Sequence, residues 1–198
     1  KPQDIFTVVD EIAGDLKPSA LVVSLAAGVT TASLEALLPD GIPVVRVMPN
    51  TPALVDEGMS AVSPGAHCTP EHVALAVRLM ACVGKVVEVP EKMQDAVTAI
   101  SGSGPAYIFY TVEAMIEAGV GLGLPRRLAT ELTLQTVYGA ATMLRETGEH
   151  PVVLRENVTS PAGTTAAALR VLEDHKVRAA FLSALEAARN RSIELAGG

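Results

Sequence analysis

The sequence predicts an α/β domain followed by an all-helical domain, and three observations support this. Short apolar runs alternate with helical patterns over the first ninety residues, as in a mostly parallel, doubly wound sheet. After Pro90 only helical patterns remain, separated by Gly, Pro or short polar breaks. A chain of 198 residues that is 49% hydrophobic can bury one good core or two small ones. We therefore expect one domain over residues 1–91 and a second over residues 92–198.

The α/β part opens on a helix rather than a strand. An amphipathic pattern runs from Ile5 to Leu16, and an α/β unit would normally start with a strand. The chain therefore looks as if it enters partway through a domain. The expected strands are residues 20–25, 43–48, 59–63 and 85–89, and the expected helices between them are residues 31–38 and 70–82. A ligand site in such a sheet should lie off the carboxyl ends of the strands.

The second half reads as a set of Ala-rich, amphipathic helices. A single copy would leave apolar helix faces exposed, so we expect self-association through this half. The expected helices are residues 94–100, 105–122, 125–146, 164–174 and 177–196.

Charge and composition exclude several classes of partner. The net charge of −7, without a Lys/Arg stripe, argues against nucleic acid and anionic lipid. No apolar run reaches the roughly 18 to 20 residues of a membrane span. Cys68 and Cys82 stand far apart and form no ligand pair, which favours a reduced, cytoplasmic setting. A small-molecule or protein partner is therefore favoured.

Residues 157–165, with the sequence Asn-Val-Thr-Ser-Pro-Ala-Gly-Thr-Thr, suggest an anion-binding loop. They run directly into an Ala-rich helix, so unpaired backbone N–H groups and up to four hydroxyls could converge on a small acid.

The ends of the first two strands carry small and polar residues. Ala26, Ala27 and Gly28 follow the first strand and would leave room for a flat ligand, whereas Asn50 and Thr51 follow the second and offer amide and hydroxyl contacts. The alternative is an ordinary pair of strand-to-helix turns, because Gly, Asn and Pro are common there.

Three other motifs favour structural interpretations. His67, Cys68 and His72 could bind a metal, but a solvated helix start fits them better and we expect no metal site. The Ser-Gly-Ser-Gly-Pro stretch at residues 101–105 lacks the spacing of a nucleophile elbow, and close helix packing is favoured over ligand contact. Glu149 and His150 fit a surface helix end better than an acid-base pair.

Four signatures in order resemble pyrroline-5-carboxylate reductase. They are Val-Met-Pro-Asn-Thr-Pro at residues 47–52, Ile-Ser-Gly-Ser-Gly-Pro-Ala-Tyr at 100–107, Gly-Leu-Pro at 123–125 and Val-Thr-Ser-Pro-Ala-Gly-Thr-Thr at 158–165. The resemblance covers essentially the whole chain. It implies the C-terminal part of a Rossmann-type doubly wound sheet, a helical dimerisation domain, and a dimer or ring of dimers.

The resemblance implies reduction of 1-pyrroline-5-carboxylate to L-proline by a hydride from NADPH or NADH, the last step of proline biosynthesis. Backbone N–H groups of Gly163, Thr164 and Thr165, with the Ser160 hydroxyl, would hold the substrate carboxylate. The Thr165 hydroxyl would hydrogen-bond the ring nitrogen as the catalytic group. The implied cofactor contacts are Ala26, Ala27, Gly28, Asn50, Thr51 and Asn157.

The Gly-rich dinucleotide turn and the first strands of that family do not occur in this sequence. We therefore expect further residues before Lys1, and we expect the chain alone to be inactive. Two alternatives stay open. One is another dehydrogenase of the β-hydroxyacid type, although no Lys lies between Ala106 and Leu154 to face its substrate. The other is a non-catalytic helical dimerisation module.

Overall fold

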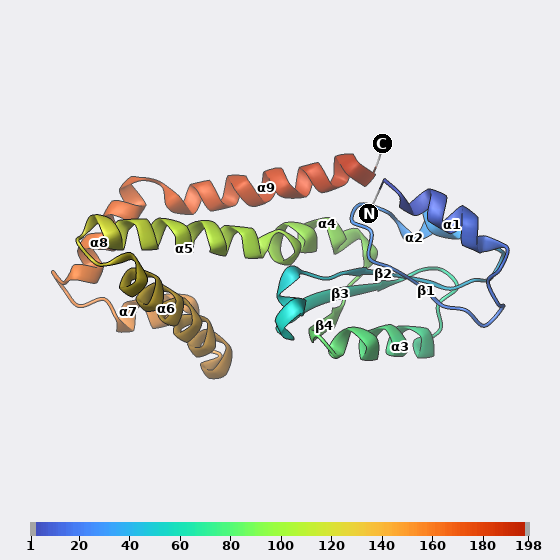
Figure 1. Ribbon diagram of the computed structural model, residues 1–198, viewed down its shortest axis with the longest axis horizontal. Helices are drawn as coiled ribbons and strands as arrows, with labels where there is room; N and C mark the ends of the chain where they lie inside the picture. The colour runs from blue at the N-terminus through green and yellow to red at the C-terminus, as the bar shows by residue number, and fades with distance from the viewer. Residues whose placement is uncertain (1–2, 197–198) are drawn as a thin grey trace. The chain divides into compact units, whose positions relative to one another are not determined.

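The computed structural model describes residues 3–196, and the chain divides into two compact units (Figure 1). The first unit extends to Pro105 and also takes in the chain from Ala184 onward, and the second comprises residues 106–183. Each unit is described by itself below.

A four-stranded sheet forms the centre of the first unit. Its strands are β1 (Val22–Ser24), β2 (Val44–Met48), β3 (Gly58–Pro64) and β4 (Gly84–Glu88), in the order β1-β2-β3-β4. The β1–β2 and β3–β4 pairs are parallel, but β2 and β3 are antiparallel. Only residues 49–57 connect β2 to β3, including the 3₁₀ helix η1 (Thr51–Val55), which is too short for a parallel crossover. The carboxyl ends of β1 and β2 therefore share one edge of the sheet, and those of β3 and β4 lie at the other.

Helices cover both faces of this sheet, which confirms the doubly wound fold (Figure 1). The helices are α1 (Ile5–Ala13), α2 (Thr31–Glu35) and α3 (Pro70–Ala81). Val44 packs in one core with residues of α1 and α2, whereas Val45 and Val47 pack in a second core with residues of α3. Alternate side chains of β2 thus point to opposite faces, as a strand requires.

The helix ends follow local chemistry. The expected helix over residues 31–38 ends at Glu35 in the structure, because Pro39 disfavours helical geometry just before it. Helix α3 begins with Thr69 as N-cap and Pro70 in its first turn, as predicted. His72 completes a capping box there: its Nδ1 accepts a hydrogen bond from the Thr69 backbone N–H at 3.1 Å.

The remaining chain is helical, as predicted. After β4 come the short helices η2 (Glu91–Met93) and α4 (Gln94–Val97), a π-helical turn η3 (Thr98–Gly102), and helices α5 (Gly104–Gly121), α6 (Arg126–Thr147), α7 (Pro151–Asn157), α8 (Thr164–Asp174) and α9 (Val177–Ala196). The bounds of α8 and α9 match the predicted ones. Helix α7 was not predicted, because a seven-residue helix shows too few turns for a periodic pattern.

Large apolar side chains are exposed on α5, α6 and α9 in the single chain. They include Phe109 and Tyr110 on α5, Tyr138 on α6 and Leu182 on α9. Among the described residues, no helix is both long and apolar enough to cross a membrane.

Gly84 provides a test of the packing between β3 and β4. Its φ is +148°, and a Cβ placed there would lie 2.1 Å from the backbone oxygen of Gly58. We expect Gly84→Ala to lower the free energy of unfolding by about 2 kcal/mol or more, because backbone atoms cannot move aside cheaply. Urea unfolding would measure this.

Gly14→Ala is the matched control in the same unit. A Cβ at Gly14 would meet no atom within 4 Å, and the residue has a right-handed helical conformation. Gly14→Ala should leave the free energy of unfolding unchanged or raise it slightly, by less than about 0.5 kcal/mol. Equal losses in the two variants would contradict the packing described for Gly84.

Candidate functional site

The carboxyl end of β1 leads into a tightly held turn. The backbone N–H of Ala26 donates a hydrogen bond to Ser24 Oγ at 3.3 Å, and Ala26 and Gly28 are both buried. Gly28 has φ +75°, a left-handed conformation that favours glycine. Thr30 ends the turn as N-cap of α2, where its Oγ1 accepts a hydrogen bond from the Ser33 N–H. The turn at 25–30 is therefore fixed at both ends; its middle residues are small, whereas the Leu25 side chain is exposed.

At the carboxyl end of β2, Asn50 acts as a tether. Its Nδ2 donates to the backbone oxygen of Ser101 at 3.0 Å, and its Oδ1 accepts from the Met59 N–H at 2.8 Å. The side chain thus joins the end of β2 to β3 and to the π-helical turn. Thr51 differs, because its side chain is exposed and makes no hydrogen bond among the described residues. The structure gives Asn50 a structural role and leaves the Thr51 hydroxyl available.

The Ser-Gly-Ser-Gly-Pro stretch packs against the same strand end. A Cβ on Gly102 would lie 2.5 Å from Cε of Met48, the last residue of β2. The Ser101 hydroxyl donates to the backbone oxygen of Val97, so it is used within the helix. The π-helical turn therefore approaches the end of β2 closely at Gly102, where the neighbouring atom is the mobile end of the Met48 side chain. Such π-helical turns recur at functional sites.

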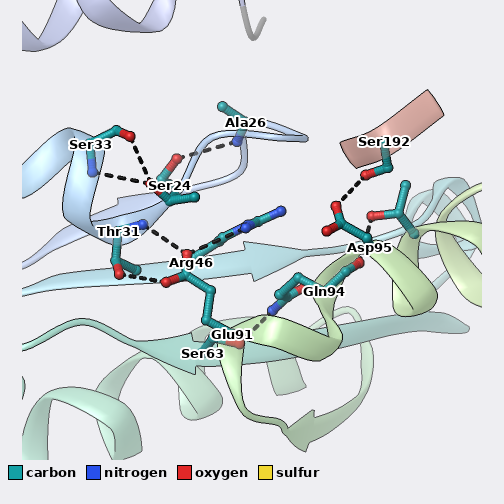
Figure 2. Close-up of polar contacts among 12 residues, drawn as sticks. Ser24, Ala26, Thr31, Ser33, Arg46, Ser63, Glu91, Gln94, Asp95 and Ser192 are labelled. Atoms are coloured by element: carbon teal, nitrogen blue, oxygen red, sulfur yellow. Dashed lines mark hydrogen bonds and ion pairs between the residues drawn. The ribbon is translucent and has the colours of Figure 1, made fainter. Parts of the chain in front are cut away.

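A buried ion pair lies beside these turns and was missed by the sequence analysis. Arg46, in the middle of β2, is 4% exposed, and its Nη1 lies 3.3 Å from Glu91 Oε1 (Figure 2). The Glu91 carboxylate also accepts two hydrogen bonds from Thr31, one from the backbone N–H and one from Oγ1, each 2.8 Å long. The one signal in the sequence was an arginine inside an otherwise apolar strand.

Further polar groups lie on the same side of the sheet. Ser63, the register partner of Arg46 on β3, accepts a 2.7 Å hydrogen bond from Gln94 Nε2. Asp95, next in the chain, accepts one of 2.7 Å from the Ser192 hydroxyl near the end of α9 (Figure 2). Within this group of side chains, the buried atoms Arg46 Nη2 and Gln94 Oε1 have no hydrogen-bond partner among the described residues.

In the second unit, the predicted anion-binding loop connects α7 to α8. The Gly163 N–H donates to the backbone oxygen of Ser160 at 3.0 Å, and Ala162 has φ +55°. With Pro161 in second place, this is the pattern of a type II turn. The expectation that the Gly163 N–H is free for an anion is wrong, because this turn already uses it. Gly163 serves instead as N-cap of α8.

The amides that follow Gly163 are free. Helix α8 begins at Thr164 and has no side-chain cap, so the N–H groups of Thr164 and Thr165 have no intrahelical acceptor. The hydroxyls of Ser160, Thr164 and Thr165 also make no hydrogen bond among the described residues. Thr159 is different: its hydroxyl donates to the backbone oxygen of Arg155 on α7. Three of the four predicted hydroxyls therefore remain available.

The ends of α7 carry two residues considered from the sequence. Asn157 is the last residue of α7, and its side chain is exposed. His150 is the N-cap, with Nδ1 accepting a 3.3 Å hydrogen bond from the Val152 N–H. The helix-end interpretation of His150 is confirmed.

A shallow hollow of about 400 Å³ lies near the loop, but the predicted substrate-binding residues do not line it. Three arginines and two glutamates line it, and Arg178 is hydrogen-bonded to Glu173 and lowers the pKa of that carboxyl. The residues that line the hollow are Arg155, Glu156, Thr159, Ala166, Leu169, Arg170, Glu173 and Arg178.

The tether at Asn50 yields a prediction that separates structure from binding. Asn50→Ala removes two hydrogen bonds to backbone groups and should lower the free energy of unfolding by about 1–3 kcal/mol. Thr51→Ala, next in the chain, removes a free, exposed hydroxyl and should change it by less than about 0.5 kcal/mol. Thermal unfolding of both variants measures this. Equal stability of the two would contradict the tether.

The comparisons with known proteins agree with this arrangement. Residues 91–195 match the family model "Pyrroline-5-carboxylate reductase dimerisation". The pyrroline-5-carboxylate reductase of Corynebacterium melassecola is 50% identical over 198 residues, which cover 98% of this chain and 73% of that protein. The Escherichia coli reductase is 44% identical, over 98% of this chain and 72% of its own length.

Solved structures match over the whole chain as well. A pyrroline-5-carboxylate reductase from Coxiella burnetii superposes with a TM-score of 0.90 at 44% identity, covering 98% of this chain and 73% of that one. The Plasmodium falciparum pyrroline carboxylate reductase with NADP bound has a TM-score of 0.93 at 33% identity, covering 98% and 78%. With both of its units matched by these relatives, the chain belongs to the pyrroline-5-carboxylate reductase family.

Proposed function

We propose that loop 157–165 binds the carboxylate of 1-pyrroline-5-carboxylate through the first free amides of α8. The family reaction is the reduction of this cyclic imine to L-proline with NAD(P)H, the last step of proline biosynthesis, and the chain is an oxidoreductase of that kind. The observation that supports the proposal is the pair of unpaired N–H groups at Thr164 and Thr165 beside three free hydroxyls.

An anion at this position needs no cationic side chain. No Lys or Arg occurs over residues 156–169, so the loop itself carries no positive side chain. Backbone N–H groups at a helix start, aligned with the helix dipole, stabilise a carboxylate at this place. Ser160 supplies a hydroxyl donor from the other side of the turn. Gly163 closes the turn and starts the helix, so its contribution is geometric rather than a direct hydrogen bond.

The Thr165 hydroxyl is the proposed catalytic group at the ring nitrogen. Thr165 is half-buried at the start of α8, and its hydroxyl has no hydrogen-bond partner within residues 3–196. A hydroxyl is too weak an acid to protonate the imine at neutral pH, so its role is to orient the ring by a hydrogen bond. The proton arrives with the substrate or from water.

The edge formed by the carboxyl ends of β1 and β2 fits a dinucleotide. Ala26, Ala27 and Gly28 have small side chains or none, and Gly28 has a positive φ at which a Cβ would be strained. The Thr51 hydroxyl is free, whereas Asn50 would contribute through its backbone, because its amide is occupied. Asn157 is a further proposed cofactor contact, which the family resemblance implies. When bound, NAD(P)H supplies the hydride.

The chain self-associates through its helical part, since residues 91–195 match the family's dimerisation model. The exposed apolar side chains on α5, α6 and α9 supply apolar surface for such an assembly. We propose residues 1–91 as the dinucleotide-binding part and residues 92–198 as the part that binds substrate and dimerises. The proposed location is the cytoplasm.

Thr165→Ala tests the catalytic assignment. In the full-length protein, losing the hydrogen bond to the ring nitrogen should reduce transition-state stabilisation by about 0.5–1.5 kcal/mol or more. That corresponds to a kcat/KM for 1-pyrroline-5-carboxylate that is roughly twofold to tenfold lower, or more. The measurement is the rate of NADPH oxidation, followed by absorbance. Thr165→Ser keeps the hydroxyl and is the matched control.

The two variants separate the possible results. Near wild-type kcat/KM for Thr165→Ser with a loss for Thr165→Ala supports the hydroxyl's role. Full activity in Thr165→Ala would remove that role while leaving the amide cradle in place. A wild-type protein that oxidises no NAD(P)H with this substrate would contradict the proposed function itself.

A further inference from the structure

We propose that Glu91 is a positioning residue for the cofactor edge, acting through Arg46 and Thr31. The proposal rests on the proposed function, because it assumes that two turns contact NAD(P)H: residues 25–30 after β1 and residues 49–51 after β2. Glu91 itself lies in η2, shortly after β4 and directly after Pro90. In the sequence it is far from both of these turns.

The first link runs from Glu91 to the end of the β1 turn. Thr31 is the first residue of α2 and follows the turn at 25–30 directly. The Glu91 carboxylate accepts both the Thr31 backbone N–H and the Thr31 hydroxyl, each at 2.8 Å. A two-point contact of this kind fixes the direction in which α2 leaves the turn. Ser24 holds the other end of the turn through the Ala26 N–H.

The second link runs from Glu91 to β2. Arg46 lies two residues before the end of β2, and the ion pair to Glu91 gives its guanidinium an acidic partner. Arg46 is almost fully buried, and its Nη2 has no hydrogen-bond partner. A buried cation without its carboxylate is strongly unfavourable, so Glu91 and Arg46 are held together. Because Glu91 also binds Thr31, this contact fixes the position of β2 relative to α2.

Together the two links put both strand ends under the control of one carboxylate. The parallel register pairs Ser24 at the end of β1 with Arg46 of β2, so the two turns start at the same edge of the sheet. Glu91 binds Thr31 of α2, which follows the turn at 25–30, and Arg46 of β2, which precedes the turn at 49–51 (Figure 2). Loss of the carboxylate should loosen both turns at once. The substrate loop belongs to the other unit.

The test compares cofactor binding with stability in the full-length protein. The variants are Glu91→Gln, which removes the charge with little change of shape, and Thr31→Val, which removes only the hydroxyl hydrogen bond. We expect the Kd for NADPH to rise roughly tenfold in Glu91→Gln and about threefold to tenfold in Thr31→Val. The KM for 1-pyrroline-5-carboxylate and kcat at saturating NADPH should stay within about twofold of the wild type. Fluorescence titration gives Kd without turnover, and thermal unfolding gives stability.

Three further variants make the result specific. Glu88→Gln removes an exposed carboxylate on the same segment and should leave the Kd for NADPH unchanged. Thr31→Ser keeps the hydroxyl and Arg46→Lys keeps the charge, and both should retain most of the wild-type affinity for NADPH. Thr31→Val also provides the test if Glu91→Gln does not fold, because Val replaces Thr at nearly equal volume.

A lower unfolding temperature with unchanged Kd in Glu91→Gln and Thr31→Val would overturn the proposal, since the contacts would then be structural only. An equal rise of the Kd in Glu88→Gln would overturn it too, because the effect would follow from net charge. Wild-type protein that binds neither NADPH nor NADH would end the proposed function and this inference together. Wild-type turnover with unaffected Kd in the variants would end this inference alone.

Discussion

The buried cation of Arg46 is the constraint on which the first unit depends. A guanidinium that is 4% exposed in the middle of a sheet must have a carboxylate beside it. Glu91 provides that carboxylate, so the segment that follows β4 has to pass close to β2. The same carboxylate receives the first amide of α2. Glu91, at the start of the segment that leads into the helical part, is thereby joined to α2 and to β2. Both of these elements lie at the edge where the ligand is expected.

The mixed sheet concentrates the ligand edge on two strands. Because β3 runs antiparallel to β2, β1 and β2 are the two of the four described strands whose carboxyl ends lie at that edge. The short connection through η1 also brings Asn50 to β3, where its amide bonds to the Met59 N–H. The π-helical turn packs its Gly102 against Met48 at the same strand end. Each neighbour thus fixes the strand-end turns rather than leaving them as mobile loops, which lowers the entropy cost of binding.

The sequence predicted the two fold classes and the start of most helices, because these depend on local patterns. The capping of α3 by Thr69 and Pro70 and the start of α8 after Gly163 are chemistry within one turn of a helix. The pair of Arg46 and Glu91 lies beyond such reasoning, since its partners are 45 residues apart. The occupied Gly163 amide and the tether at Asn50 were also missed. Both depend on which backbone groups fold back on them, and residue type alone does not show that.

The central claim is that backbone amides at the start of α8 hold the substrate carboxylate. Thr164→Pro tests it most directly, because proline is tolerated at the first position of a helix and removes only that N–H and the side-chain hydroxyl. Gly163 has φ −80° and ψ 174°, which a following proline accepts. Thr164→Ala is the control that loses the hydroxyl and keeps the N–H. The measurement is the KM for 1-pyrroline-5-carboxylate in the full-length protein, with thermal unfolding alongside. The amide cradle predicts a KM about tenfold higher or more in Thr164→Pro than in Thr164→Ala, at similar stability. Equal KM values in the two variants would contradict it.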